Sequence, residues 1–265
     1  MATKYLSKLQ GKRVLLIGGT AGIGYAIAEA CVEYGADVTV ASSKQANVDK
    51  AVETLKASYP NATERVRGHI CDVTTDDLEP HIKALLDFAT NNNTTKLDHI
   101  VDTAGGNVVA TKYDAAEPSQ LSAVFKSRLI PKVVLAKLAR VYLNNSYTSS
   151  LTWTGGSNTY KPLAGYAILA LYGGAGDSLG RGLAKDMAPI RVNIVAPGAI
   201  RTRLLERLGT RQGGDVEEAM QRFAKMSLLD RVGQPEEVAE SYLAIMKNHF
   251  QTGTVVHCDG GYPLL

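Results

Sequence analysis

The stretch RVLLIGGTAGIG, residues 13–24, decides the fold. Its first part is a short apolar run that ends in glycines, which predicts a buried strand over 13–19. The continuation GIGYAIAEACVEYGA (22–36) carries apolar residues at helical spacing and closes at Gly35. The glycines at 18, 22 and 24 therefore lie in a turn between a strand and a helix. Such a turn lets the backbone approach a pyrophosphate, whose charge is met by the helix N-terminus.

Strands and helices alternate along the rest of the chain. Further strands are predicted over 37–42, 66–73, 97–106, 149–156, 190–198 and 252–261. Further helices are predicted over 47–60, 76–90, 118–143, 169–187 and 235–247, with a bend at Pro131. This alternation favours an α/β fold of the Rossmann type, a doubly wound parallel sheet with helices on both faces. We find no repeat and no linker, so we predict a single domain over 1–265.

The composition excludes several classes of protein. A net charge of +3 on 265 residues gives no reason to expect nucleic acid or a membrane surface as partner. The first strand is reached before a signal-peptide core could form, and no apolar stretch has the length of a membrane span. Three widely spaced cysteines without a CxxC predict buried thiols in a reducing compartment, the cytoplasm. No metal-ligand spacing and no GxSxG motif is present, so we expect no metal site.

The end of the second strand predicts which dinucleotide is bound. An acidic residue on the ribose hydroxyls would indicate NAD, but Asp37 begins this strand, and the ribose lies beyond its other end. That end carries Ser42, Ser43 and Lys44, whose hydroxyls and cation suit a 2′-phosphate. We therefore expect NADP.

In these features the chain resembles the short-chain dehydrogenase/reductase family over nearly its whole length. The family's motif TGxxxGIG appears as residues 17–24. Its NNAG motif appears in altered form, as DTAG, at residues 102–105. The segment IRVNIVAPGAIRT (190–202) matches its RVN…PGxxxT segment. The resemblance implies contacts with the adenine, the ribose region and the nicotinamide carboxamide. The cofactor residues expected in total are Gly18, Thr20, Gly22, Ile23, Gly24, Ser42, Ser43, Lys44, Asp72, Val73, Thr103, Ala104, Gly105, Pro197, Gly198, Ile200 and Thr202.

The resemblance fails at the catalytic residues. The family uses Asn, Ser, Tyr and Lys, with Tyr as proton donor and Lys lowering the pKa of that Tyr. An ungapped alignment places Leu169 at the Tyr position, Gly173 at the Lys position and Arg128 at the Asn position. The Ser position falls on Thr154, Gly155 or Ser157. The candidate catalytic residues are Arg128, Thr154 and Tyr166.

Four further residues have competing interpretations. Tyr166 and Tyr172 could replace the missing donor, but neither is followed four residues later by a lysine, and packing is the alternative. Asp102 at the end of a central strand needs a partner, either a structural one, which we favour, or the substrate. Trp153 is expected to pack in the core rather than to line the substrate pocket.

Three functions are compatible with this sequence. The first is an NADPH-dependent reductase of secondary metabolism that transfers hydride to an imine or iminium. An iminium already carries the positive charge that protonation would create, so its reduction needs no proton donor. The second is a non-redox cyclase or isomerase, and the third is an NADP-binding protein without catalysis. Divergent family members without the tetrad resemble bifunctional alkaloid enzymes that use an Arg and an Asp. Arg128 matches the Arg, but Leu163 stands where we expect the Asp. We expect a small-molecule substrate. The resemblance implies a homodimer or homotetramer built on the helices over 118–143 and 169–187.

Overall fold

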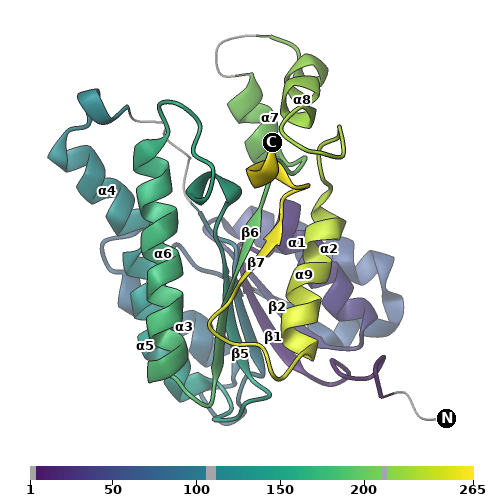
Figure 1. Cartoon of the computed structure of the whole chain (residues 1–265). Helices are drawn as coiled ribbons and strands as arrows, with labels where there is room; N and C mark the ends of the chain where they lie inside the picture. The colour runs from purple at the N-terminus through teal and green to yellow at the C-terminus, as the bar shows by residue number, and fades with distance from the viewer. Residues whose placement is uncertain (1–3, 106–111, 211–213) are drawn as a thin grey trace.

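The computed structural model describes residues 4–105, 112–210 and 214–265, and its strands form one sheet (Figure 1). The sheet has seven strands, all parallel, in the order β3-β2-β1-β4-β5-β6-β7. Their bounds are β1 Arg13–Ile17, β2 Asp37–Ser42, β3 Val66–Ile70, β4 His99–Asp102, β5 Ser150–Thr154, β6 Arg191–Pro197 and β7 Val255–Cys258. The predicted single-domain Rossmann-type fold is confirmed. Gly106, the last residue of the predicted fourth strand, lies outside the described residues.

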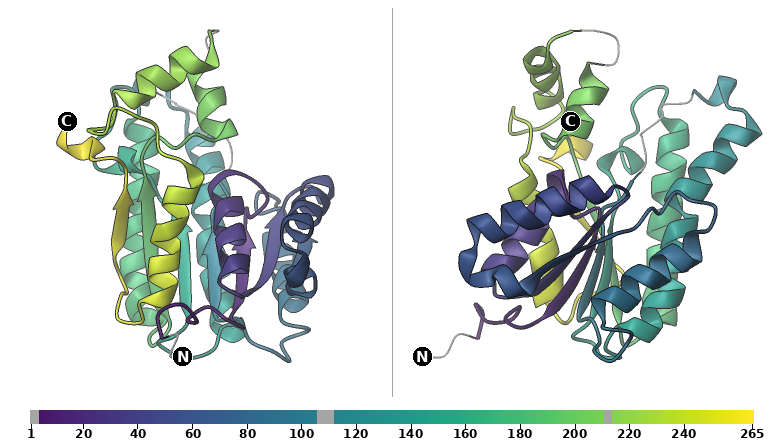
Figure 2. Two further views of the ribbon diagram at one scale, coloured as in Figure 1. Left: turned by 90° about the vertical axis from the view of Figure 1, so that its right-hand side faces the viewer. Right: turned by 180° about the vertical axis from the view of Figure 1, so that it is seen from behind.

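Helices cover both faces of the sheet (Figures 1 and 2). One face carries α1 (Gly22–Glu33), α2 (Gln45–Ser58) and α9 (Pro235–Lys247). The other face carries α3 (Leu78–Ala89), α5 (Ile130–Tyr142) and α6 (Ala167–Asp186). Successive strand residues point to opposite faces. Val14 and Leu16 therefore pack with α1 and α9, while Leu15 and Ile17 pack with α3 and α5.

The helix predicted over 118–143 is two helices. α4 (Pro118–Arg128) ends at Arg128 with Leu129 as its C-cap, and α5 begins with Pro131 in its first turn. Proline has no N–H to donate and fixes φ, so it is tolerated at a helix start but not inside one. The expected bend at Pro131 is confirmed, and it places Arg128 at the end of α4.

Two short helices, α7 (Arg203–Gly209) and α8 (Val216–Ala224), lie beyond the carboxyl ends of the strands (Figure 1). They were not predicted, because 7 and 9 residues are too few for a helical repeat to show clearly. No helix in the described part of the chain is long and apolar enough to span a bilayer.

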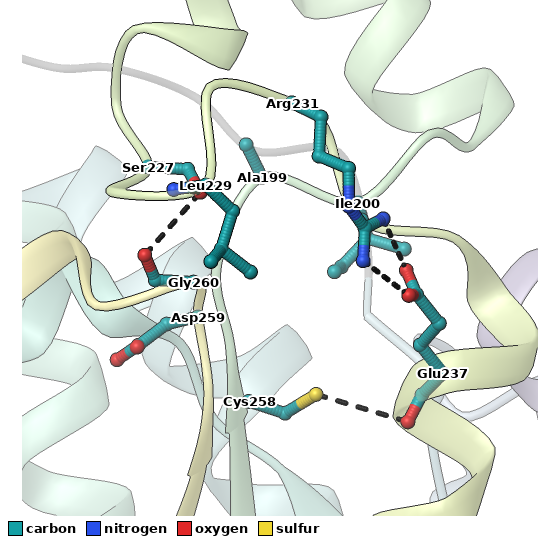
Figure 3. Close-up of a pocket in the computed structure, with 10 residues that line it drawn as sticks. Ala199, Ile200, Ser227, Leu229, Arg231, Glu237, Cys258, Asp259 and Gly260 are labelled. Carbon is teal, nitrogen blue, oxygen red and sulfur yellow. Dashed lines mark hydrogen bonds and ion pairs between the residues drawn. The ribbon is translucent and has the colours of Figure 1, made fainter.

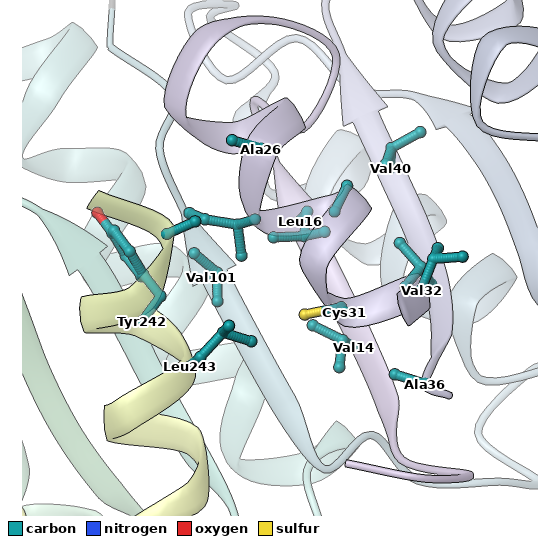
Figure 4. Close-up of a cluster of buried hydrophobic side chains, with 14 of the residues drawn as sticks. Val14, Leu16, Ala26, Cys31, Val32, Ala36, Val40, Val101, Tyr242 and Leu243 are labelled. Carbon is teal, nitrogen blue, oxygen red and sulfur yellow. The ribbon is translucent and has the colours of Figure 1, made fainter. Parts of the chain in front are cut away.

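The core between α1, α9 and the sheet is closely packed (Figure 4). Val101 of β4 and Leu243 of α9 face Cys31 of α1 there. Burial raises the pKa of Cys31 to about 12, so its thiol stays protonated at neutral pH. Cys31 and Cys71 are buried, as the sequence predicted, and Cys258 is half-buried.

Buried polar groups hold the amino ends of the central strands. Arg191 donates to the carbonyl oxygens of Tyr147 and Ile245, both at 2.7 Å. His99 lies beside it, with Nδ1 2.9 Å from the Ser150 hydroxyl. Burial, and then the charge of Arg191, hold the pKa of His99 well below its usual value. His99 is therefore neutral in the folded protein near neutral pH.

His99 predicts a loss of stability in acid. Below pH 6.5 the unfolded chain takes up a proton at this imidazole, whereas the folded chain does not. As the pH is lowered below 6.5, the free energy of unfolding should therefore decrease by as much as ~1.4 kcal/mol per pH unit for this one group. Chemical denaturation between pH 7 and 5 measures this slope. His99→Asn should flatten it, and His81→Asn on the exposed surface controls for the loss of an imidazole. A wild-type slope that survives His99→Asn would contradict the assignment.

Candidate active site

The glycine turn after β1 is packed against the end of β4. A Cβ at Gly24 would overlap the carbonyl oxygen of Gly18, and a Cβ at Gly18 would lie 2.7 Å from the Thr103 hydroxyl. Gly18 also has φ +81°, which favours glycine. Thr103 donates from Oγ1 to the carbonyls of Ile17 and Gly18, both at 3.2 Å. The turn therefore accepts no side chain at these two positions.

The amino end of α1 has the features of a phosphate site. In the described residues, no side chain caps this helix and its first turn carries no acidic residue. The first N–H groups of a helix have no partner within the helix, and they favour an anion. These residues therefore fit the pyrophosphate of a dinucleotide.

The segment after β6 meets the same turn. A Cβ at Gly22 would lie 3.1 Å from Cγ2 of Thr202, which caps α7 by accepting from the Leu205 N–H. Ile200 of this segment pairs with Gly233 and lines a pocket of about 170 Å³ (Figure 3). Predicted cofactor residues from β1, β4 and β6 are thus brought to one edge of the sheet.

Figure 3 shows an ion pair between two residues that line this pocket. Arg231 makes a two-pronged ion pair with Glu237, through Nη1 at 2.8 Å and Nη2 at 2.5 Å. The bond from Arg231 holds the pKa of Glu237 down to about 2. The pair fixes the loop before α9, and through Gly233 it supports Ile200.

The end of β2 lies where the sequence argument requires it. Asp37 pairs with Arg13 at the amino edge of the sheet, and Ala41 pairs with Ile17 at the carboxyl edge. Ser42, Ser43 and Lys44 follow at that edge, and the last two are exposed. Asp72 follows the neighbouring β3, where its Oδ1 accepts from the backbone N–H of Thr74 at 2.8 Å and fixes the turn that includes Val73.

Asp102 has a structural partner. Its Oδ2 accepts from Nζ of Lys132 at 2.9 Å, and its Oδ1 accepts from the backbone N–H of Ala104 at the same distance. Both charged side chains are buried, and Lys132 lies over the ring of Trp153. The structural interpretation of Asp102 is confirmed, and so is core packing for Trp153, which is 1% exposed.

Arg128 lies beside the end of β4. Its Nη1 is 3.4 Å from the point that a Cβ at Gly105 would occupy. Burial lowers the pKa of Arg128, while Tyr172 acts in the opposite direction. A half-buried guanidinium at the carboxyl edge of the sheet can hold a carbonyl, a carboxylate or a developing oxyanion.

The two tyrosines occupy different positions. Tyr172 is buried and donates to the carbonyl of Leu121 in α4 at 3.2 Å, and burial raises its pKa. Its hydroxyl is therefore held by α4. Tyr166 is the residue before α6 and is half-buried.

Thr154 points to the face opposite α6. Its hydroxyl lies 2.6 Å from the hydroxyl of Tyr242 on α9 and 3.3 Å from the carbonyl of Asp102. The alternation along β5 explains this, because Trp153 faces α6 and its neighbour must face α9. Ser157, another residue that the alignment allowed at the Ser position, lies in the next turn and is 8% exposed.

Sequence reasoning missed the contacts between this turn and α6. The hydroxyl of Tyr160 donates to Asp177, a buried carboxylate in the middle of α6. Burial raises the pKa of Asp177, and the bond from Tyr160 opposes this rise. The ring of His257 stands edge-on to Tyr160, with centroids 4.4 Å apart.

In the described residues, no cluster of three or more acidic, histidine or cysteine side chains could hold a metal ion.

Comparison with known proteins identifies the family. The model of the SDR-like Rossmann domain matches residues 5–265. The short-chain dehydrogenase/reductase ucsE of Acremonium sp is 38% identical over 263 residues, which cover 98% of both chains. The chain belongs to the short-chain dehydrogenase/reductase family. It is therefore an enzyme of the reductase type that this family comprises, and its fold binds a nicotinamide cofactor.

Solved structures of this family are similar over the whole chain. MalC reductase/Diels-Alderase from Malbranchea aurantiaca has a TM-score of 0.91 at 36% identity, covering 98% of this chain and 100% of that chain. A short-chain dehydrogenase from Burkholderia cenocepacia in complex with NADP has a TM-score of 0.81 at 25% identity, covering 96% and 99%.

The glycine turn of this short-chain dehydrogenase/reductase gives the first test of cofactor binding. Gly24→Ala should weaken nicotinamide cofactor binding by at least about tenfold, because the new Cβ forces the Gly18 carbonyl out of place. Titration of nicotinamide fluorescence measures the Kd. Gly182→Ala on α6 is the matched control, since its Cβ meets nothing within 4 Å. Equal affinities for the two variants would contradict this site.

Proposed function

We propose that this protein is an NADPH-dependent reductase that transfers hydride to an imine or iminium acceptor in secondary metabolism. The observation that carries the proposal is the pair Leu169 and Gly173, which stands where the family has its Tyr and Lys. In this proposal the neighbouring tyrosines do not replace the pair as proton donor. Tyr172 is held by α4, and Tyr166 has Ala170 rather than a lysine four residues later.

An iminium acceptor removes the need for a proton donor. Hydride from the nicotinamide forms a C–H bond at the iminium carbon, and the π electrons become the lone pair of a neutral amine. NADPH becomes NADP⁺, and no proton is consumed. Reduction of a neutral carbonyl would instead form an alkoxide, and the absence of a positioned acid costs about 10² to 10⁴ in rate.

Arg128 is the proposed positioning group for the substrate. A cation would repel an isolated iminium, so the proposed substrate also carries a carbonyl or carboxylate oxygen near its C=N bond, which Arg128 binds. Tyr166 and Thr154 keep lesser proposed roles, Tyr166 from its position before α6 and Thr154 through its contacts with Asp102 and Tyr242.

A ring-closing activity is the second candidate. It is favoured by the likeness to MalC reductase/Diels-Alderase, together with Arg128. Leu163, 40% exposed, stands where we expected an acid for this chemistry. The reductase therefore remains the leading proposal.

Lys44 should determine the choice of cofactor. Lys44→Asp replaces a cation that suits the 2′-phosphate with a carboxylate that suits a ribose hydroxyl. The Kd for NADPH should rise at least about tenfold, which corresponds to a loss of about 1.4 kcal/mol in binding free energy. The affinity for NADH should increase. Lys50→Asp makes the same charge change on the exposed surface of α2 and should leave the preference unchanged. An unaltered NADPH/NADH ratio in Lys44→Asp would reject the assignment.

Paired acceptors should reveal the missing acid. With NADPH, a cyclic iminium salt that carries a carbonyl should be reduced at least about 100-fold faster than the matched ketone. Arg128→Ala should lower kcat/KM for this salt by about tenfold or more, and Arg128→Lys should recover part of the loss. Arg140→Ala, an exposed arginine at the far end of α5, is the control. Efficient ketone reduction would show that a proton donor is present.

The outer surface of α5 and α6 should form the homo-oligomer interface. Ile130, Val133 and Val141 lie on one face of α5 and are about half exposed, as is Leu171 on α6. Val133→Glu together with Leu171→Arg should shift the light-scattering mass to that of a monomer, because both charges would be buried. A wild-type monomer at micromolar concentration would contradict the interface.

A further inference from the structure

The turn between β5 and α6 rests on the helix face that would carry the family's catalytic pair. Ser157–Thr159 pack against α6. Leu169, Gly173 and Asp177 are four residues apart, so they share one face of this helix. The turn contacts this face at Gly173 and, through Tyr160, at Asp177.

Thr159 fills the space above Gly173. A Cβ built on Gly173 would overlap the Thr159 hydroxyl, and it would lie 3.0 Å from Cβ and 3.4 Å from Cγ2 of the same residue. Gly174 and Gly182 of the same helix differ, because a Cβ there meets nothing within 4 Å. Glycine is therefore required at 173 by a specific side chain and not by the general packing of α6.

Tyr160 fixes the turn in this position. Its hydroxyl bonds to Asp177, which is 5% exposed, and Oδ1 of Asp177 is 3.6 Å from the point that a Cβ at Gly155 would occupy. The residue that follows Thr159 thus ties the turn to α6. For a side chain to enter at 173, Thr159 would have to leave while its neighbour stays bonded.

We propose that Thr159 is a specificity-determining residue, which excludes a side chain at position 173 and so keeps a second cation out of the substrate pocket. This inference rests on the proposed reduction of a cationic C=N bond. A lysine at 173 would place a positive charge beside such a substrate and weaken its binding by repulsion. The binding of a neutral acceptor would be little affected. The pairing of Thr159 with Gly173 therefore selects the charge of the acceptor.

The test compares two double variants that differ only in charge. Thr159→Gly/Gly173→Lys and Thr159→Gly/Gly173→Met both open the space and fill it with a long side chain. With NADPH bound equally by both, the Lys variant should have a kcat/KM for the iminium salt about tenfold or more below that of the Met variant. The inhibition constants of the matched neutral ketone for the two variants should agree within about twofold. Equal values for the two variants on the iminium salt would overturn the proposal.

A second measurement needs no substrate, and it separates this proposal from the proposed function. Melting temperatures are compared for Gly173→Ala, Thr159→Gly and their combination. In the wild-type background, Gly173→Ala should lower the melting temperature by several degrees, because the new Cβ overlaps Thr159. In the Thr159→Gly background, the same substitution should leave the melting temperature unchanged or raise it, because alanine favours a helix. Additive effects would overturn the exclusion of side chains by Thr159. If coupling is found but the wild type reduces no iminium salt, the proposed function fails and not the contact.

Discussion

The contact of backbone against backbone at the end of β1 is the constraint on which the rest of the structure depends. Gly24 in the first turn of α1 lies so close to the carbonyl of Gly18 that neither residue accepts a side chain. Thr103 joins this contact to β4, and Thr202 joins it to the segment after β6. The strand order reverses between β1 and β4, so these segments meet beside the amino end of α1, which is where a dinucleotide binds in this fold.

The residues that α4, α5 and α6 bring beside the ends of β4 and β5 form one consistent set. The sequence alignment puts Leu169 and Gly173 at the positions of the family's Tyr and Lys, and Thr159 occupies the space that a larger residue at 173 would use. Lys132 forms a buried ion pair with Asp102 and lies over the ring of Trp153. The guanidinium of Arg128 is half-buried beside the end of β4. In the proposed function, Arg128 orients an oxygen of the substrate and no Tyr and Lys pair donates a proton.

Local patterns predicted the fold, and contacts distant in sequence limited the prediction of the site. The bounds of β2 and α9 agree with the prediction because their apolar patterns are bounded by clear breaks, and the position of Asp37 at the amino edge follows from strand direction alone. The orientation of Thr154 towards α9 was also contained in the alternation along β5. The overlap of Thr159 with Gly173, and the bond from Tyr160 to Asp177, had no sequence signal, because each depends on how a turn rests on a helix.

The central claim is that hydride transfer here needs no proton donor. Single-turnover transfer from NADPH to a permanently charged iminium salt tests it most directly, followed from pH 6 to 9 in H₂O and D₂O with protiated and 4-deuterated NADPH. We predict a primary isotope effect from the nicotinamide, no solvent isotope effect, and a rate that changes by less than about twofold with pH, since no acid ionises in this step. A solvent isotope effect, together with a rate that falls as a phenol or ammonium group loses its proton, would contradict the account.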